Sequence, residues 1–277
     1  MVGIEPLRGP AAAPAAASWF SGAQRNPPSN RLRALLATVV LLVGILTFVL
    51  IAKQPTGSNA AGQAAPPAAV AGARATSPTE KARTALLVLS DLPKGWTSTK
   101  SQNNNSPFPG AAQLAGCLGV PTSVITSQPP TAYSPEFASK DQRQLVSDSV
   151  SVYPSARAAQ ADFASLANPK TPSCLTTVLN NQAKAALGSG FGTGTSLGTV
   201  TVTRAPATEF APHNANFTAL VPVTDQGATL NLQLTVVDFV RGTEEQTVTL
   251  VAVQGPFPTA LARHLTTVAA GRIYLAG

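Results

Sequence analysis

Residues 230–252 read LNLQLTVVDFVRGTEEQTVTLVA, and this stretch decides the fold class. Up to Val236, every second residue is apolar and the positions between them hold Asn, Gln or Thr. A period of two places alternate side chains on opposite faces of a β-strand. Arg241-Gly242 turns the chain, and a second alternating run begins at Val248. Two such runs joined by a short turn predict an antiparallel pair of strands.

The flanking sequence extends this pair into a sheet with helices. Further strands are expected over residues 145–153, 199–203 and 217–223. Apolar residues at helical spacing predict helices over residues 80–89, 110–118, 156–166, 171–187 and 258–271. An antiparallel sheet buries at least one apolar face, and these helices can cover it. We therefore expect an α+β fold, with an antiparallel sheet of about five strands covered by helices, preceded by one transmembrane helix. The α+β domain would span residues 80–277.

The transmembrane helix is predicted over residues 34–52 (ALLATVVLLVGILTFVLIA), which contain no charged residue. A helix of this length matches a hydrocarbon core of about 30 Å. Residues 1–33 hold most of the nearby arginines and are expected to be a disordered cytoplasmic tail, so the positive-inside rule places the domain outside the cytoplasm. Residues 53–79, rich in Pro and Ala, are expected to form a linker. The alternative is a signal peptide that is cleaved near Ala60.

The net charge of +7 does not indicate a nucleic-acid partner. More than half of the excess lies before residue 81, where residues 1–33 carry four Arg and one Glu, and residues 53–80 carry one Lys, one Arg and one Glu. The rest is scattered, without a basic run or interleaved aromatic residues. We expect no binding of nucleic acid.

Cys117 and Cys174 are the two cysteines of the chain. Outside the cytoplasm, two thiols in one domain usually form a disulfide. A metal site is disfavoured because neither cysteine has a His or a second Cys at ligand spacing. A nucleophilic cysteine would leave the other thiol unpaired. The expected state is a Cys117–Cys174 disulfide that joins two of the predicted helices.

The sequence offers no catalytic constellation. Its two histidines, His213 and His264, are each expected to be surface or hydrogen-bonded residues. Residues 188–194 are rich in glycine but follow a helix and lack the lysine of a phosphate-binding loop. Asn104 and Asn216 match the glycosylation pattern, which recurs by chance. We expect no catalytic residue, cofactor or metal, and the ligand-binding residues stay undefined.

Several segments resemble a family of actinobacterial envelope proteins: residues 86–96 (LLVLSDLPKGW), 150–164 (VSVYPSARAAQADFA) and 169–175 (PKTPSCL), together with Cys117. The likeness covers residues 80–275 and is to the extracytoplasmic sensor-like domains of mycobacterial receptor kinases and to related small secreted lipoproteins. It implies a sheet paired with helices, disulfides, an envelope location and a binding or sensing role. This sequence departs from that family in showing one cysteine pair and neither a kinase domain nor a lipobox.

Three functions follow as hypotheses. The first is a membrane-anchored, extracytoplasmic, non-enzymatic binding or sensing module of the cell envelope, which takes a small molecule, lipid, glycan or protein between sheet and helices. The second is a structural or assembly partner of an envelope protein complex. The third, which the missing motifs disfavour, is an envelope hydrolase that uses His213 or His264.

Overall fold

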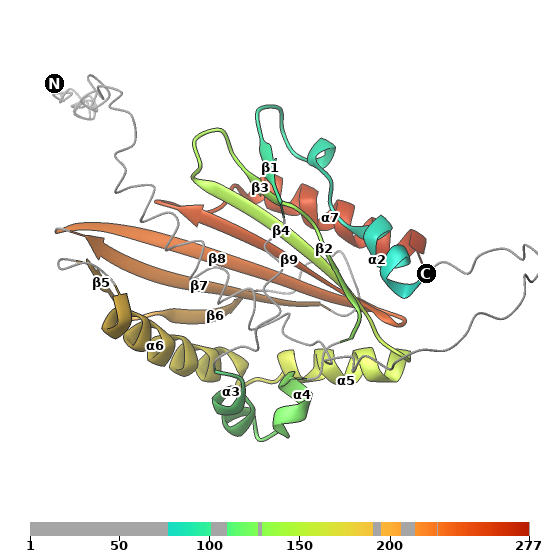
Figure 1. The fold of residues 1–277 in the computed structure, drawn as a ribbon, viewed down its shortest axis with the longest axis horizontal. Helices are drawn as coiled ribbons and strands as arrows, with labels where there is room; N and C mark the ends of the chain where they lie inside the picture. Colours follow the sequence, from blue (N-terminus) through green and yellow to red (C-terminus); the bar gives the residue numbers. More distant parts are fainter. Residues whose placement is uncertain are drawn as a thin grey trace, which may run out of the picture. The chain divides into compact units, whose positions relative to one another are not determined.

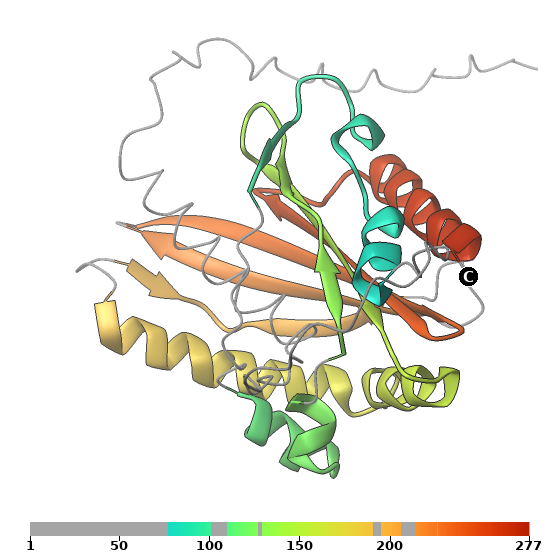
Figure 2. The ribbon, with the colours of Figure 1, turned by 45° about the vertical axis from the view of Figure 1, so that its right-hand side comes forward.

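The structure is a computed structural model and describes residues 77–100, 110–126, 129–190, 195–205, 214–225 and 227–276. In these residues, nine strands form one antiparallel sheet, accompanied by six α-helices and one 3-10 helix (Figures 1 and 2). The elements are, in chain order, α2 (Pro78–Ala85), η1 (Leu89–Asp91), β1 (Thr97–Thr99), α3 (Ala111–Leu118), α4 (Thr122–Thr126), β2 (Thr131–Tyr133), β3 (Glu136–Ala138), β4 (Gln144–Val152), α5 (Ala156–Leu166), α6 (Thr171–Gly190), β5 (Thr195–Leu197), β6 (Thr201–Ala205), β7 (Asn214–Asp225), β8 (Ala228–Arg241), β9 (Glu244–Val253) and α7 (Thr259–Ala276).

The fold class predicted from the sequence is wrong in its strand number. The sheet has nine strands instead of about five, because β1, β2, β3 and β5 have three residues each and are too short to show a periodic pattern. No helix in the described part of the chain is long and apolar enough to cross a membrane. Residues 34–52, where a transmembrane helix is predicted, lie outside the described residues, as do the predicted tail and residues 53–76 of the predicted linker.

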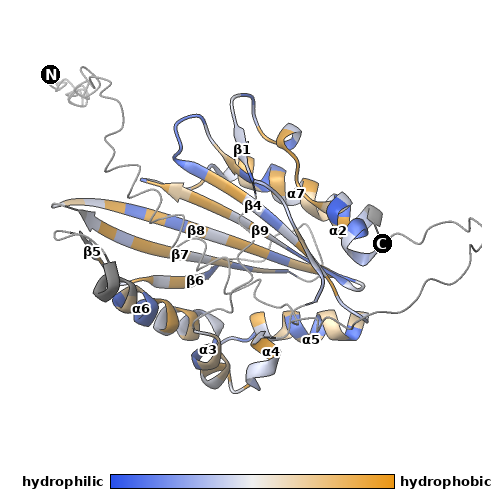
Figure 3. Cartoon of the chain, viewed as in Figure 1, coloured by the Kyte–Doolittle hydropathy of each residue, from blue (hydrophilic) through white to orange (hydrophobic). Residues whose placement is uncertain are grey.

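The strands follow the order β1-β3-β4-β9-β8-β7-β5, with β2 also paired to β4 and β6 to β7. β7, β8 and β9 form the meander that the alternating runs predict, and β9 then pairs with β4 along its whole length. The centre of the sheet is therefore β4, β9 and β8. Figure 3 shows the alternation of hydropathy along β7 and β8 that gives each strand two different faces.

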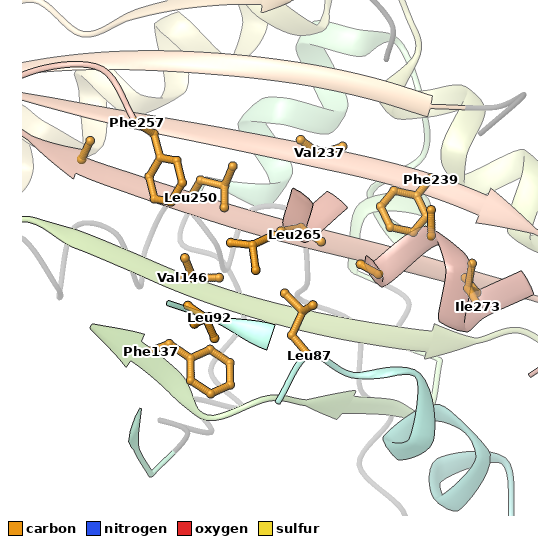
Figure 4. Close-up of a cluster of buried hydrophobic side chains, with 14 residues drawn as sticks. Leu87, Leu92, Phe137, Val146, Val237, Phe239, Leu250, Phe257, Leu265 and Ile273 are labelled. Atoms are coloured by element: carbon orange, nitrogen blue, oxygen red, sulfur yellow. The ribbon is translucent and has the colours of Figure 1, made fainter. Parts of the chain in front are cut away.

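One face of the sheet, here called the α7 face, packs against α7, α2 and the segment around η1 (Figure 1). Leu265 and Ile273 of α7 lie over Leu250 and neighbouring sheet residues, and all three are at most 1% exposed (Figure 4). Apolar burial of this extent is the main stabilising contribution to the fold. The cluster comprises Leu87, Leu92, Phe137, Val146, Val237, Phe239, Val248, Leu250, Ala252, Phe257, Leu265, Ala269, Ala270 and Ile273.

The opposite face, here called the α6 face, is lined by α5 and α6 (Figure 2). Its apolar part lies on β6, β7 and the first half of β8, and α6 packs there through Val178 and neighbouring side chains. Cys117 of α3 is joined to Cys174 of α6, with the two Cα atoms 5.7 Å apart. The expected disulfide is thus present, and it attaches α3 to this layer.

Serine side chains cap the N-terminal ends of two helices. Ser77 caps α2 by accepting the Glu80 N–H at 3.2 Å, and Ser155 caps α5 by accepting the Ala158 N–H at 3.2 Å. The first helix is shorter than predicted, however. It ends at Ala85 instead of at the predicted Leu89, and Leu89 is 41% exposed. The chain leaves the helix there because the Leu87 N–H bonds to a sheet carboxylate instead.

Candidate functional site

Polar side chains gather on the α6 face where β4, β9 and β8 run side by side. The strand register aligns residues of the three strands in three rows across the sheet, and seven of these nine residues are polar. The rows are Ser147–Thr249–Val236, Ser149–Thr247–Asp238 and Ser151–Glu245–Val240. We call the seven polar residues the polar cluster; they are Ser147, Ser149, Ser151, Asp238, Glu245, Thr247 and Thr249.

The polar cluster becomes more buried from β4 towards β8. Ser147 and Ser151 are half-buried, whereas the remaining members are almost fully enclosed. Their exposed fractions are 2% for Ser149, 5% for Thr247, 1% for Thr249, 5% for Glu245 and 0% for Asp238. Polar groups at this depth stabilise a fold only when they are hydrogen-bonded, so their partners decide their role.

Asp238 is the deepest member. The Thr247 hydroxyl donates to Asp238 Oδ1 in a very short hydrogen bond. Burial raises the pKa of the Asp238 carboxyl well above its ordinary value, the negative charge of Glu245 raises it further, and the Thr247 hydrogen bond opposes the shift. Burial and the nearby negative charge thus both favour the neutral form of the Asp238 carboxyl. Its Oδ2 atom and Thr249 Oγ1 are both buried and have no hydrogen-bond partner among the described residues.

A tyrosine links this part of the sheet to α5. Tyr153 Oη lies 2.7 Å from Glu245 Oε2 and 2.5 Å from Asp162 Oδ2 on α5. The Tyr153 N–H donates to the Thr243 carbonyl at 2.7 Å, which fixes the tyrosine to the β8–β9 turn. Burial, followed by the charge of Glu245, raises the pKa of the Tyr153 phenol, so it keeps its proton at every physiological pH.

Two titratable side chains border the polar cluster on the strands next to β4. Tyr133 of β2 is opposite Ser149, and Glu136 of β3 belongs to the same face because its neighbour Phe137 points to the other one. Both are half-buried, and burial raises the pKa of each. The region between β3 and β8 thus combines hydroxyls, a phenol and carboxyl groups.

A second buried polar network lies on the α7 face, around Asp148 of β4. Its Oδ2 accepts the Leu87 N–H at 2.8 Å, and Gln246 Nε2 lies 3.0 Å from both carboxylate oxygens. Burial raises the pKa of Asp148 to about 7, against the opposing effects of these hydrogen bonds and of the Arg272 charge. Arg272 of α7 donates to the Leu86 carbonyl at 2.5 Å. This network holds the α2–η1 segment between sheet and α7, which is a structural role.

The structure does not bring the two histidines into a site. His264 lies on the exposed side of α7 with Nε2 3.2 Å from the Asp91 carbonyl oxygen, and His213 lies outside the described residues. Asn216 is 3% exposed on β7, and Asn104 is not described. Of the glycine-rich stretch, residues 188–190 end α6 and residues 191–194 are not described. In the described part of the chain, no group of three His, Cys, Asp or Glu residues could hold a metal ion.

Sequence reasoning missed the polar cluster, although the sequence contains a signal for it. The alternation in β4 and β9 predicts strands from its apolar residues, and the polar residues between them were given no role. The polar residues between the apolar ones are Ser147, Ser149 and Ser151 in β4, and Glu245, Thr247 and Thr249 in β9. Because β4 and β9 are central strands, both of their faces are covered, and small hydroxyl side chains in alternation mark a buried polar face.

Comparison with known proteins adds little to this description. No family model and no curated protein matches the chain. Among solved structures, the extracellular domain of PknH from Mycobacterium tuberculosis is similar, at 10% identity and a TM-score of 0.35, over 72% of this chain and 98% of that one. Because a TM-score of this size does not transfer a function, we draw the function from this chain's own residues alone.

Proposed function

We propose that this protein is a non-enzymatic binding module that acts outside the cytoplasm and takes a small, uncharged polar molecule at the polar cluster. The observation that carries this proposal is the pair of buried atoms Asp238 Oδ2 and Thr249 Oγ1, which have no hydrogen-bond partner among the described residues. An unmet buried polar group costs about 1–3 kcal/mol. A bound molecule that pairs with both atoms recovers that free energy.

The chemistry of the polar cluster selects the ligand class. The neutral form of Asp238, which burial favours, can donate an O–H group, and the Ser and Thr hydroxyls both donate and accept. Glu245 and Glu136 lie on the same face and disfavour an anion. These groups are complementary to a neutral molecule that carries several hydroxyl or amide groups, such as a sugar, a polyol or a small amide.

The position of Tyr153 supports binding over hydrolysis. In carboxylate-based glycoside hydrolases, the scissile bond lies between two carboxyl groups. Here the Tyr153 hydroxyl lies between Asp162 and Glu245, within hydrogen-bond distance of both. It occupies the space that a substrate would need. The alternative hydrolase with a catalytic histidine gains no support from His264, which lies on the other side of the sheet, on α7.

The disulfide supports a location outside the cytoplasm. Cys117 is exposed and Cys174 is 1% exposed, and disulfides form and persist in oxidising compartments. An oxidising environment is therefore part of the proposal.

A thermal-shift and calorimetry screen of neutral sugars, polyols and amides tests the proposal. We expect at least one class to raise the Tm of the full-length protein, and Thr249→Val to abolish that shift. Thr203→Val is the matched control, because Thr203 is exposed on β6, outside the polar cluster. If no class binds, or if Thr249→Val binds as tightly as the control, the proposal is wrong.

A further inference from the structure

Tyr133 is a half-buried aromatic side chain at the border of the polar cluster. It lies opposite Ser149 in the pairing of β2 with β4, so it continues the row Ser149–Thr247–Asp238 onto a fourth strand. Its neighbour Ala132 is buried on the α7 face with residues of α2. Because successive side chains of a strand point to opposite faces, Tyr133 belongs to the α6 face, beside the polar cluster.

Hydrogen bonds fix the orientation of the Tyr133 ring. The Thr131 side chain, two residues earlier on the same face, is hydrogen-bonded to Tyr133 and lowers the pKa of the phenol, against the larger raising effect of burial. The Thr131 hydroxyl donates to the Pro129 carbonyl at 2.9 Å and lies 2.9 Å from Ser151 Oγ. Since Thr131 has donated its hydrogen, its oxygen accepts from the hydroxyls of Tyr133 and Ser151. The Tyr133 ring therefore lies along β2 in a fixed position.

The polar cluster is less enclosed on the side where Tyr133 lies. Ser147 and Ser151 of β4 are half-buried, whereas Asp238 of β8 is fully enclosed. Tyr133 of β2 and Glu136 of β3 are also half-buried, and their strands both pair with β4. A molecule that binds from this side therefore meets a phenol ring and a carboxyl group next to the hydroxyls.

Tyr133 differs in exposure from other aromatic side chains on this side of the sheet. Tyr153, Phe163 and Phe217 lie on the α6 face or on the helix that packs against it, and each is at most 9% exposed. Their rings belong to the core, whereas part of the Tyr133 side chain is accessible. An accessible aromatic ring beside a few convergent polar groups is the usual composition of a small-molecule site.

We propose that Tyr133 stacks against the ring of a bound sugar and thereby selects a cyclic sugar over an acyclic polyol or an amide. The two faces of a sugar ring carry C–H groups, and its rim carries hydroxyls. The negative face of an aromatic ring attracts the C–H groups, while the hydroxyls of the polar cluster and the Glu136 carboxyl pair with the rim. An acyclic polyol offers similar hydroxyls without a flat C–H face. This inference rests on the proposed function and narrows its ligand class.

Titration calorimetry of the full-length protein with matched ligands tests this inference. The ligands are glucose and sorbitol, mannose and mannitol, galactose and galactitol, and acetamide as the amide. We expect at least one sugar to bind more tightly than its polyol and than acetamide. Tyr133→Leu should weaken binding of that sugar by about two- to tenfold, the size of one aromatic contact, and leave polyol binding unchanged. Tyr133→Phe keeps the ring and is the matched control, so it should keep the preference for the sugar.

Proton NMR of the sugar gives a second readout that needs no variant. Because an aromatic ring shields protons above its face, the sugar C–H resonances should move upfield when the wild-type protein binds it. If no sugar, polyol or amide binds, the proposed function and this inference are both wrong. This inference alone is overturned if a polyol or acetamide binds as tightly as the sugars, if the bound sugar shows no upfield shift, or if folded Tyr133→Leu keeps the preference.

Discussion

Asp148 is expected to make this protein less stable as the pH rises from about 4 to 7. Its folded-state pKa is about 7, against an ordinary value of 3.8, and burial is the main cause. In this interval the folded state keeps a proton that the unfolded chain has lost. The free energy of unfolding should therefore fall by about 1.4 kcal/mol per pH unit, and by about 4 kcal/mol over the whole interval. Below pH 4 this stabilisation is fully present, and above pH 7 it is lost.

Asp148→Asn removes the titration while keeping an oxygen that can accept the Leu87 N–H. The substitution also changes the contact with Gln246, which shifts the free energy of unfolding at every pH. The quantity to compare is therefore the slope of that free energy against pH. Urea unfolding followed by circular dichroism at several pH values between 4.5 and 7 gives that slope for each protein. The difference between wild type and variant should be about 1.4 kcal/mol per pH unit near pH 5.5. The contribution of Asp238 to the slope is the same in both proteins, so it cancels in the difference.

Asp141→Asn is the control for this comparison. Asp141 is exposed, and its hydrogen bond from Ser139 lowers its pKa, so it is ionised in both folded and unfolded states above pH 5. Removal of the Asp141 carboxyl should leave the slope of the unfolding free energy between pH 5 and 7 unchanged. Parallel stability curves for wild type and Asp148→Asn would refute the assignment of a protonated Asp148 to the folded state.

Three further predictions concern stability. Leu250→Ala, in the core of the α7 face, should lower the free energy of unfolding by about 2–5 kcal/mol in urea titration. Replacing Cys117 and Cys174 together by Ser should lower the free energy of unfolding by up to about 4 kcal/mol, because the disulfide closes a loop with a sequence separation of 57. Calorimetry of the oxidised wild type and of the variant measures this difference. Arg272→Met should lower the free energy of unfolding by about 1–3 kcal/mol in urea titration at pH 7. Asp91 loses its 2.7 Å ion pair, and the Leu86 carbonyl loses its hydrogen-bond donor.

The parts of the fold predicted from the sequence are those with a long periodic pattern or a capping residue. The strand predicted over residues 145–153 is β4, and the helices predicted over residues 156–166 and 110–118 are α5 and α3, the latter ended by Gly119 at φ +73°. The pairing of Cys117 with Cys174 also followed, because two cysteines allow one pairing. For the strand and the helices, the signal lies within a few residues of the feature it predicts.

The missed features depend on contacts between distant segments. β2 and β3 are three residues long and exist because β4 offers them a partner, which no local pattern around residues 120–144 reveals. The polar cluster forms only when β4, β9 and β8 are placed in register. Likewise, Tyr153 and Glu245 meet across 92 positions of sequence. Buried polar networks therefore have to be identified from the tertiary structure, whereas caps and long strands can be predicted from the local sequence.

The two threonines of the polar cluster separate a structural role from a binding role. Thr247 donates to Asp238, so Thr247→Val should destabilise the fold by about 1–3 kcal/mol. Thr249→Val removes a buried hydroxyl that has no partner among the described residues, so it should be neutral or stabilising. If the polar cluster served folding alone, valine would be the better residue at position 249, at equal volume and in a strand that favours β-branched side chains. Under the proposed function, the Thr249 hydroxyl pairs with the ligand, so Thr249→Val should lose ligand binding without losing stability.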